Sequence, residues 1–81
     1  MKKIAVILCG SGFKDGSEIR ESVATLWALS QHHAESACFA PDALQSEVVN
    51  CLTGQTVESE KRNQLVEAAR IARGKVRPLA E

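Results

Sequence analysis

The sequence predicts an α/β domain built on an open, mostly parallel sheet, and three observations support this fold class. Residues 3–8, KIAVIL, form a run of apolar and β-branched side chains, which is typical of a central strand buried on both faces of a parallel sheet. From residue 18 to about residue 31 the apolar side chains recur at steps of three and four, the spacing of an amphipathic helix. Residues 36–40, SACFA, predict a second strand that ends before Pro41. Strand, helix and strand in this order make a βαβ unit, whose crossover is right-handed in nearly all known cases.

The second half of the chain continues this alternation. Residues 46–56 alternate loosely around Thr53 and Gly54, which indicates a small hairpin or a short strand and a turn. Residues 60–73 have the spacing of a second amphipathic helix, with Gly74 placed to cap it, and residues 75–79, KVRPL, start a third strand. We therefore expect helices on both faces of the sheet, with one of these two helices on each face.

The length of the chain limits it to one domain. A chain of 81 residues buries only a little over about 60% of its unfolded surface, so its core is marginal. Two helices cannot cover both faces of the sheet, and a third strand so close to the end leaves a parallel edge without a partner. We expect residues 1–81 to be a single incomplete α/β domain, the N-terminal segment of a longer one, which forms a homodimer or associates with its missing C-terminal part.

The charge pattern excludes several classes of partner. Ten basic and ten acidic residues give a formal net charge of zero, and no long block of like charge predicts binding to nucleic acid or to a membrane surface. No apolar stretch approaches the roughly 18 residues that span a bilayer, and the opening MKKIAVIL lacks the longer apolar core and cleavage site of a secretory signal. We expect the chain to be cytoplasmic.

The three cysteines, Cys9, Cys38 and Cys51, are odd in number and lie far apart, without a C-x-x-C pair or a histidine at ligand spacing. We therefore expect neither a disulfide framework nor a metal site. His32 and His33 follow the first helical pattern, and this position favours a solvated helix end over metal binding.

The loop after the first strand, CGSGFKDGSEI at residues 9–19, borders the crevice at the carboxyl end of the predicted sheet. It fits the dinucleotide fingerprint G-x-G-x-x-G poorly, because Asp15 occupies the position of the third glycine. Asp15 and Glu18 also place negative charge at the helix start, where it would repel a phosphate. Their spacing favours a capping box with Asp15 as the N-cap, and a carboxyl group that faces the crevice as proton donor or acceptor is the alternative. Cys9, at the end of a buried strand, is more typical of a small core residue than of a nucleophile.

On these residues the chain resembles a known family, the ElbB-type or isoprenoid-biosynthesis glyoxalases of the PfpI/ThiJ, class I glutamine-amidotransferase-like superfamily. The resemblance runs over the whole chain and rests on MKKIAVIL with its glycine-rich loop, DGSEI, CFAPD, LTG and RNQLVEAARIARGKVRPLA. It implies a flavodoxin-like fold, of which this chain is the N-terminal part, and a full-length member more than twice as long.

The resemblance also implies a reaction. A cysteine thiolate on a strand-to-helix elbow would attack glyoxal or a related small dicarbonyl and, without a cofactor, release a 2-hydroxy acid such as glycolate. The Glu of DGSEI, Glu18, would hold the thiol proton and act as acid and base, and Gly10, Ser11 and Gly12 would form a loop of the substrate pocket. The family loop usually has Ser-Gly-Cys-Gly where this chain has Cys-Gly-Ser-Gly. In the family the nucleophile elbow lies downstream of Glu81 and none of the three cysteines matches it, so we expect the 81-residue chain alone to be inactive.

A second hypothesis is a non-enzymatic α/β half-domain that acts by association with a partner. Arg62 and Asn63 match a pair that is typical of the family, and we expect them to be structural.

Overall fold

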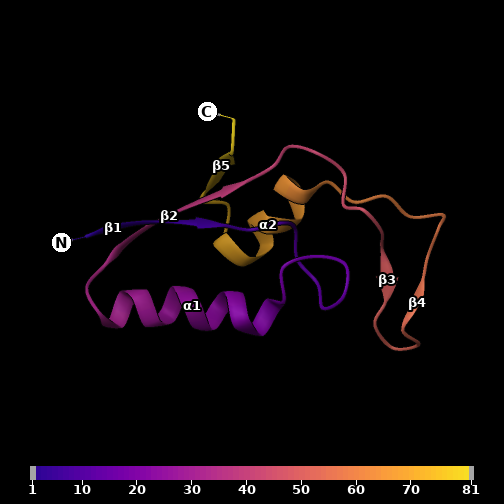
Figure 1. Cartoon of the computed structure of the whole chain (residues 1–81), viewed down its shortest axis with the longest axis horizontal. Helices are drawn as coiled ribbons and strands as arrows, with labels where there is room; N and C mark the ends of the chain where they lie inside the picture. Colours follow the sequence, from indigo (N-terminus) through magenta and orange to yellow (C-terminus); the bar gives the residue numbers. More distant parts are fainter. Residues whose placement is uncertain (1, 81) are drawn as a thin grey trace.

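The computed structural model describes residues 2–80 and contains two helices and five strands in an α/β arrangement (Figure 1). The elements in chain order are β1 (Lys3–Ile7), α1 (Ile19–Gln31), β2 (Glu35–Ala40), β3 (Val49–Asn50), β4 (Gln55–Thr56), α2 (Gln64–Ala72) and β5 (Val76–Pro78).

The main sheet has the order β1-β2-β5, and both of its strand pairs are parallel. The predicted α/β class with a parallel sheet is therefore confirmed. Within residues 2–80 the central position predicted for the first strand is wrong, because β1 lies at an edge of the sheet there, and its side chains Ile4 and Ile7 are 37% and 55% exposed. Both crossovers step in the same direction across the sheet, so β1 stays at the edge from which the chain starts.

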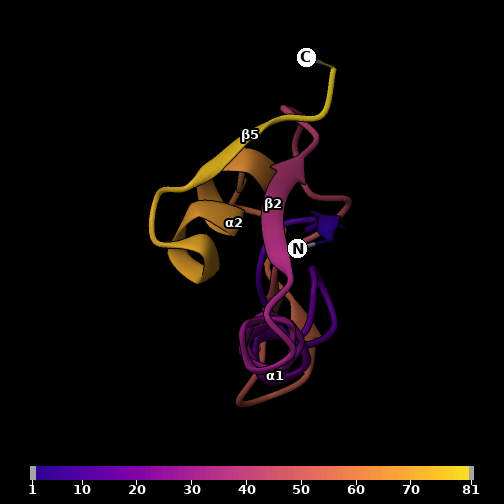
Figure 2. The same ribbon diagram turned by 90° about the vertical axis from the view of Figure 1, so that its left-hand side faces the viewer.

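Both helices lie on the same face of this sheet and contact each other (Figure 2). Because each crossover is expected to be right-handed and both step in the same direction, both helices come to the same side. The expectation of one helix on each face is wrong for this chain. Within residues 2–80 the opposite face of the sheet carries no helix, and the register places Phe39 between Ile7 and Arg77 on it.

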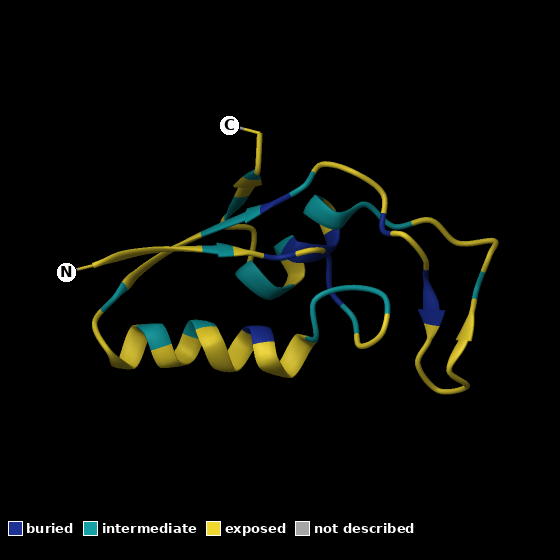
Figure 3. Ribbon diagram, viewed as in Figure 1, coloured by how far each residue is buried: buried dark blue, intermediate teal, exposed yellow. Residues whose placement is uncertain are grey.

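The core lies between the sheet and the helices, and it is small. Leu8, Ala40 and Ala68 are buried at its centre, and they are surrounded by the half-buried side chains of Val6, Cys38, Leu65, Ile71, Ala72 and Val76. The dark-blue buried segments gather near the carboxyl ends of β1 and β2, whereas most of α1 is exposed (Figure 3). The chain measures 44 × 27 × 15 Å. The shortest dimension is consistent with one sheet covered by one layer of helices.

The ambiguous segment at residues 46–56 forms a hairpin of β3 and β4, in which Val49 pairs with Thr56. Gly54 has a φ of +79°, which its lack of a Cβ permits at the turn. The second helix begins at Gln64, later than predicted, because Asn63 acts as its N-cap and accepts a hydrogen bond from the Val66 amide. No helix among residues 2–80 is long and apolar enough to cross a membrane.

Candidate functional site

The loop that follows β1 is closed at its base by hydrogen bonds between its two ends. The Cys9 amide donates to Ser17 Oγ at 2.8 Å, and the Ser17 amide donates to the Cys9 carbonyl at 3.3 Å. One step further in, the Gly12 amide donates to the Ser17 carbonyl, and the Ile19 amide donates to the Gly12 carbonyl. Residues 9–19 therefore form a compact loop that is held at the carboxyl end of the sheet.

Two glycines of this loop have a steric reason for their identity. Gly10 has a φ of +83°, and a Cβ on this residue would overlap Gln45 Oε1. A Cβ on Gly12 would overlap Asp15 Oδ1. Both glycines allow side chains of the same region to approach the backbone, which is a structural role that does not require a bound phosphate.

Asp15 attaches this loop to the hairpin segment. Its Oδ2 accepts a hydrogen bond from the Val49 amide at 2.7 Å, and its carbonyl accepts one from Gln45 Nε2 at 2.8 Å. The favoured capping box, with Asp15 as the N-cap of the first helix, is therefore wrong. The parallel bridge between Gly12 and Glu18 keeps the chain extended up to Glu18, so the helix cannot begin three residues earlier.

Glu18 is itself the N-cap of α1. Its backbone is extended, at φ −65° and ψ 129°, and its Oε1 accepts a hydrogen bond from the Glu21 amide at 2.7 Å. Its carbonyl accepts bonds from both the amide and the hydroxyl of Ser22. The half-buried carboxylate thus uses Oε1 for capping, and no hydrogen bond within residues 2–80 uses Oε2.

Glu18 lines a cavity of about 320 Å³ beside the free edge of β1, which we call the β1-edge cavity. The end of β1 contributes Val6, Ile7 and Leu8, and the loop and the first turns of α1 contribute the rest of the lining: Ser17, Glu18, Glu21, Ser22 and Thr25. The cavity lies at the carboxyl end of a parallel strand, which is where open α/β sheets bind their ligands.

The other predicted pocket residues lie elsewhere. Ser11 and Gly12 line a second cavity of about 610 Å³, the cationic cavity, which is bounded by the loop, the hairpin and α2. Gly10 is buried against Gln45. The structure therefore brings Glu18 to one side of the loop, and Ser11 and Gly12 to the other.

The cationic cavity contains residues that the sequence did not indicate as a group. Its lining is Ser11, Gly12, Asp15, Ile19, Val49, Cys51, Lys61, Arg62, Glu67 and Arg70. Glu67 is buried, and its Oε1 lies 3.1 Å from Arg70 Nε and 3.7 Å from Arg62 Nη1. The spacing of Glu67 and Arg70 on one helix predicts that the two side chains form an ion pair. It does not predict that the loop at residue 11 faces this pair.

The cysteines are placed apart from Glu18. Cys9 is exposed at the loop base, Cys51 is exposed in the hairpin, and Cys38 is half-buried in β2, where burial raises the pKa of its thiol. None of the three, all within the described part of the chain, lines the β1-edge cavity. Residues 2–80 hold no group of three or more His, Cys, Asp or Glu side chains arranged to bind a metal ion.

The chain is similar to curated proteins over nearly its whole length. It is 49% identical over 78 residues to the human glutamine amidotransferase-like class 1 domain-containing protein 3, mitochondrial, and this match covers 96% of the chain and 29% of the human protein. It is 47% identical over 79 residues to the rat ES1 protein homolog, mitochondrial, covering 98% of the chain and 30% of that protein. No protein-family model matches the chain.

A solved structure has the same fold. The isoprenoid biosynthesis protein with an amidotransferase-like domain from Ehrlichia chaffeensis superimposes with a TM-score of 0.92 at 47% sequence identity, covering 96% of this chain and 36% of that one. The flavodoxin-like fold class is thereby confirmed. The chain spans about a third of the length of the relatives that it matches.

The predicted compartment is contradicted by these relatives. The human, rat and zebrafish proteins are all named as mitochondrial, so the cytoplasmic assignment is wrong. The composition of this chain could not predict the compartment, because the chain spans only about a third of the length of its relatives and carries no information about the rest of them.

The resemblance is thus confirmed by relatives and by structure: over nearly its whole length the chain is similar to about a third of glutamine amidotransferase-like class 1 proteins and of an isoprenoid biosynthesis protein with an amidotransferase-like domain.

Proposed function

We propose that this chain supplies the acid/base carboxyl group, Glu18, of a cofactor-independent glyoxalase. The enzyme would convert glyoxal or a related small dicarbonyl to a 2-hydroxy acid such as glycolate, and its nucleophilic cysteine would come from a part of the family domain outside residues 1–81. The observation that carries this proposal is the position of Glu18 in the β1-edge cavity, beside an edge of β1 that has no strand partner within residues 2–80.

The free edge of β1 supports this proposal, because it offers a position from which a nucleophile could reach Glu18. A further parallel strand paired with the free edge of β1 would end at the same edge of the sheet, next to this cavity. A cysteine at the turn after such a strand would face the Glu18 carboxylate. The Glu18 oxygen that does not cap the helix would then be available for proton transfer.

The chemistry requires a base that first accepts and then returns a proton. The thiolate adds to one aldehyde carbon of glyoxal, and the resulting hemithioacetal carries a hydrogen on that carbon. Glu18 removes this proton and delivers it to the neighbouring carbonyl carbon, which gives the thioester of a 2-hydroxy acid. Water then cleaves the thioester, so that glyoxal and one water give glycolic acid and the free thiol, with no external oxidant or reductant.

The test compares two variants of the chain completed with a family-type second half. Glu18→Gln keeps an oxygen that can accept the Glu21 amide, so the cap and the melting temperature should stay unchanged while turnover falls by about a hundredfold to ten-thousandfold. Glu21→Gln, in the same cavity, is the matched control and should change turnover by only a few fold. A loss below about tenfold for Glu18→Gln, with an unchanged melt, would limit Glu18 to capping. The 81-residue chain alone should not convert glyoxal, and turnover by it would contradict the assignment of the nucleophile.

A second candidate function, an α/β half-domain that acts by association, is favoured by a different observation. One face of the sheet is bare within residues 2–80, and the side chains of Ile7 and Phe39 lie on it. We propose that this face and the free edge of β1 are covered by the rest of the family domain or by a second copy of the chain. Both proposals can hold together, because the association would bring the nucleophile to Glu18.

A further inference from the structure

The helix side of the molecule carries a groove that lies on the other side of the loop from Glu18. A cavity of about 520 Å³ runs between the two helices and is lined by Ser11, Ile19, Val23, Leu26, Trp27, Arg70, Ile71 and Arg73. It shares Ser11, Ile19 and Arg70 with the cationic cavity of about 610 Å³. The two cavities are therefore parts of one groove, which we call the helix groove.

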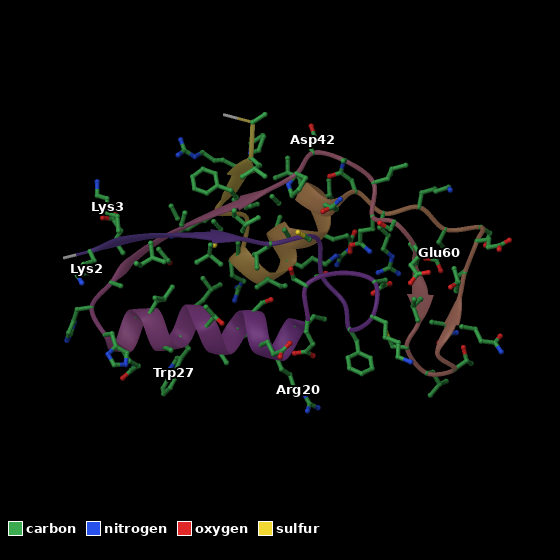
Figure 4. All side chains as sticks on the ribbon, viewed as in Figure 1. Lys2, Lys3, Arg20, Trp27, Asp42 and Glu60 are labelled. Carbon is green, nitrogen blue, oxygen red and sulfur yellow. The ribbon has the colours of Figure 1, made fainter. Side chains whose placement is uncertain are left out.

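One half of the helix groove is mainly apolar, although Arg70 and Arg73 also line it. Val23 and Trp27 on α1 are 50% and 65% exposed, although they are large apolar side chains on the face toward α2. Trp27 projects from α1 away from the sheet, at the far end of the helix from the loop (Figure 4). Exposed apolar side chains gathered in a concave surface are typical of a binding site.

The other half of the helix groove is cationic. Lys61, Arg62 and Arg70 line it, and the two carboxylates among its lining residues are already engaged. Glu67 is buried and paired with both arginines, and its pair with Arg70 uses only the Nε of that guanidinium.

Asp15 and Glu67 oppose three cations in this half, Lys61, Arg62 and Arg70, which leaves a net charge of +1. The Oδ2 of Asp15 accepts the Val49 amide, and its Oδ1 is a buried atom that lies against Gly12. The remaining N–H donors of Lys61 and Arg70 can therefore bind an anion. The buried Ser11 lines both cavities and therefore lies where the two halves meet.

We propose that the helix groove binds an amphiphile with a phosphate or carboxylate head and an apolar chain. The head lies against Lys61 and Arg70, and the chain follows α1 over Ile19 and Val23 toward Trp27. One half of the groove is mainly apolar and the other has a net positive charge. This favours the proposed ligand class over a neutral apolar molecule, which would not use Lys61 or the remaining donors of Arg70, and over a free phosphate, which would leave the apolar half empty.

The test uses the fluorescence of Trp27, the one tryptophan of the chain. Dodecyl phosphate is titrated below its micelle concentration and is expected to give a saturable blue shift, because the alkyl chain removes water from the indole. Inorganic phosphate should give no shift, and dodecyltrimethylammonium should bind at least about tenfold more weakly, since its head carries the wrong charge. Equal binding of the two alkyl ligands would overturn the proposal.

Variants locate the head. Lys61→Gln and Arg70→Gln should each weaken the binding of dodecyl phosphate by at least about tenfold, the usual effect of losing a hydrogen bond to a charged group. Arg70→Gln also removes the ion pair between Arg70 and Glu67, which can disturb the fold. Lys61 is exposed and precedes α2, so Lys61→Gln tests the proposal without this effect. Arg20→Gln is the matched control, because Arg20 is an exposed arginine of α1 that lines neither half of the groove.

Two results would contradict the proposal. An equal loss in Arg20→Gln and Lys61→Gln would mean that net charge, and not the groove, attracts the ligand. Binding to vesicles of phosphatidic acid and phosphatidylcholine without binding of monomeric dodecyl phosphate would assign the same residues to a membrane surface.

Discussion

The isolated chain has more surface than a compact protein of its size, and we predict that it associates. A compact protein of 8.8 kDa exposes about 4,800 Å². This chain exposes 5812 Å², so it carries an excess of about 1,000 Å². Its radius of gyration of 13.2 Å also exceeds the value of about 11.7 Å expected for 81 residues. The excess matches the roughly 800 Å² that each partner buries in a stable interface.

The bare face of the sheet is the surface that this association should cover. Ile7 is 55% exposed there, and Phe39 beside it is half-buried, with Arg77 packed over its ring at 5.4 Å. Replacing Ile7 by Lys would remove about 1 kcal/mol of apolar burial at the interface and add the cost of dehydrating an ammonium group. We therefore expect the dissociation constant to rise at least about tenfold.

Sedimentation velocity at micromolar concentrations measures this prediction. The native chain should sediment as a dimer or larger species, and Ile7→Lys should shift it toward the monomer. Leu52→Lys is the control, because Leu52 is 94% exposed at the hairpin turn, away from the sheet face. A compact native monomer with a cooperative melt, or equal effects of the two substitutions, would refute the reasoning.

Three further predictions concern the loop. Glu18→Ala removes the cap of α1 and should lower the free energy of unfolding by about 0.5–2 kcal/mol in a thermal melt, whereas Glu18→Gln should leave it nearly unchanged. Asp15→Ala removes a charge-assisted bond to the Val49 amide and should cost about 1.5–3 kcal/mol, with faster hydrogen exchange at that amide as the specific sign. Gly10→Ala must move Gln45 and adopt a positive φ, so it should destabilise the chain by about 1–3 kcal/mol, more than Ala24→Gly on the exposed face of α1, which should cost only about 1 kcal/mol.

Local patterns in the sequence predicted where the strands lie along the chain, but not which elements pack against them. The first five residues of KIAVIL form β1 and SACFA lies within β2, because β-branched and apolar runs determine backbone conformation over a few residues. The same run predicted a strand buried on both faces, and β1 is exposed at an edge. A run of apolar residues predicts that both faces of a strand are buried. It does not show which elements bury them, and these elements can lie in another part of a longer domain.

The candidate site was predictable only where it depends on neighbours in sequence. Glu18 was found because it belongs to a short motif, although its role as the N-cap was assigned to Asp15. The cationic cavity was missed, because its residues come from the loop, the hairpin and α2 and meet only in the folded chain. Arg62, expected to be structural, pairs with Glu67 and also lines this cavity.

The two oxygens of Glu18 allow one residue to have both roles that its sequence position left open. A cap needs a fixed acceptor, and the 2.7 Å bond from the Glu21 amide supplies it at Oε1. An acid/base catalyst needs an oxygen that can gain and lose a proton toward a reacting group, and Oε2, which no hydrogen bond within residues 2–80 uses, is the oxygen that we propose for this role. Capping also fixes the rotamer of the carboxylate, which positions the second oxygen before any partner arrives. In this arrangement the helix cap and the proposed proton transfer reinforce each other. Glu18→Gln separates the two roles because it keeps the first and removes the second.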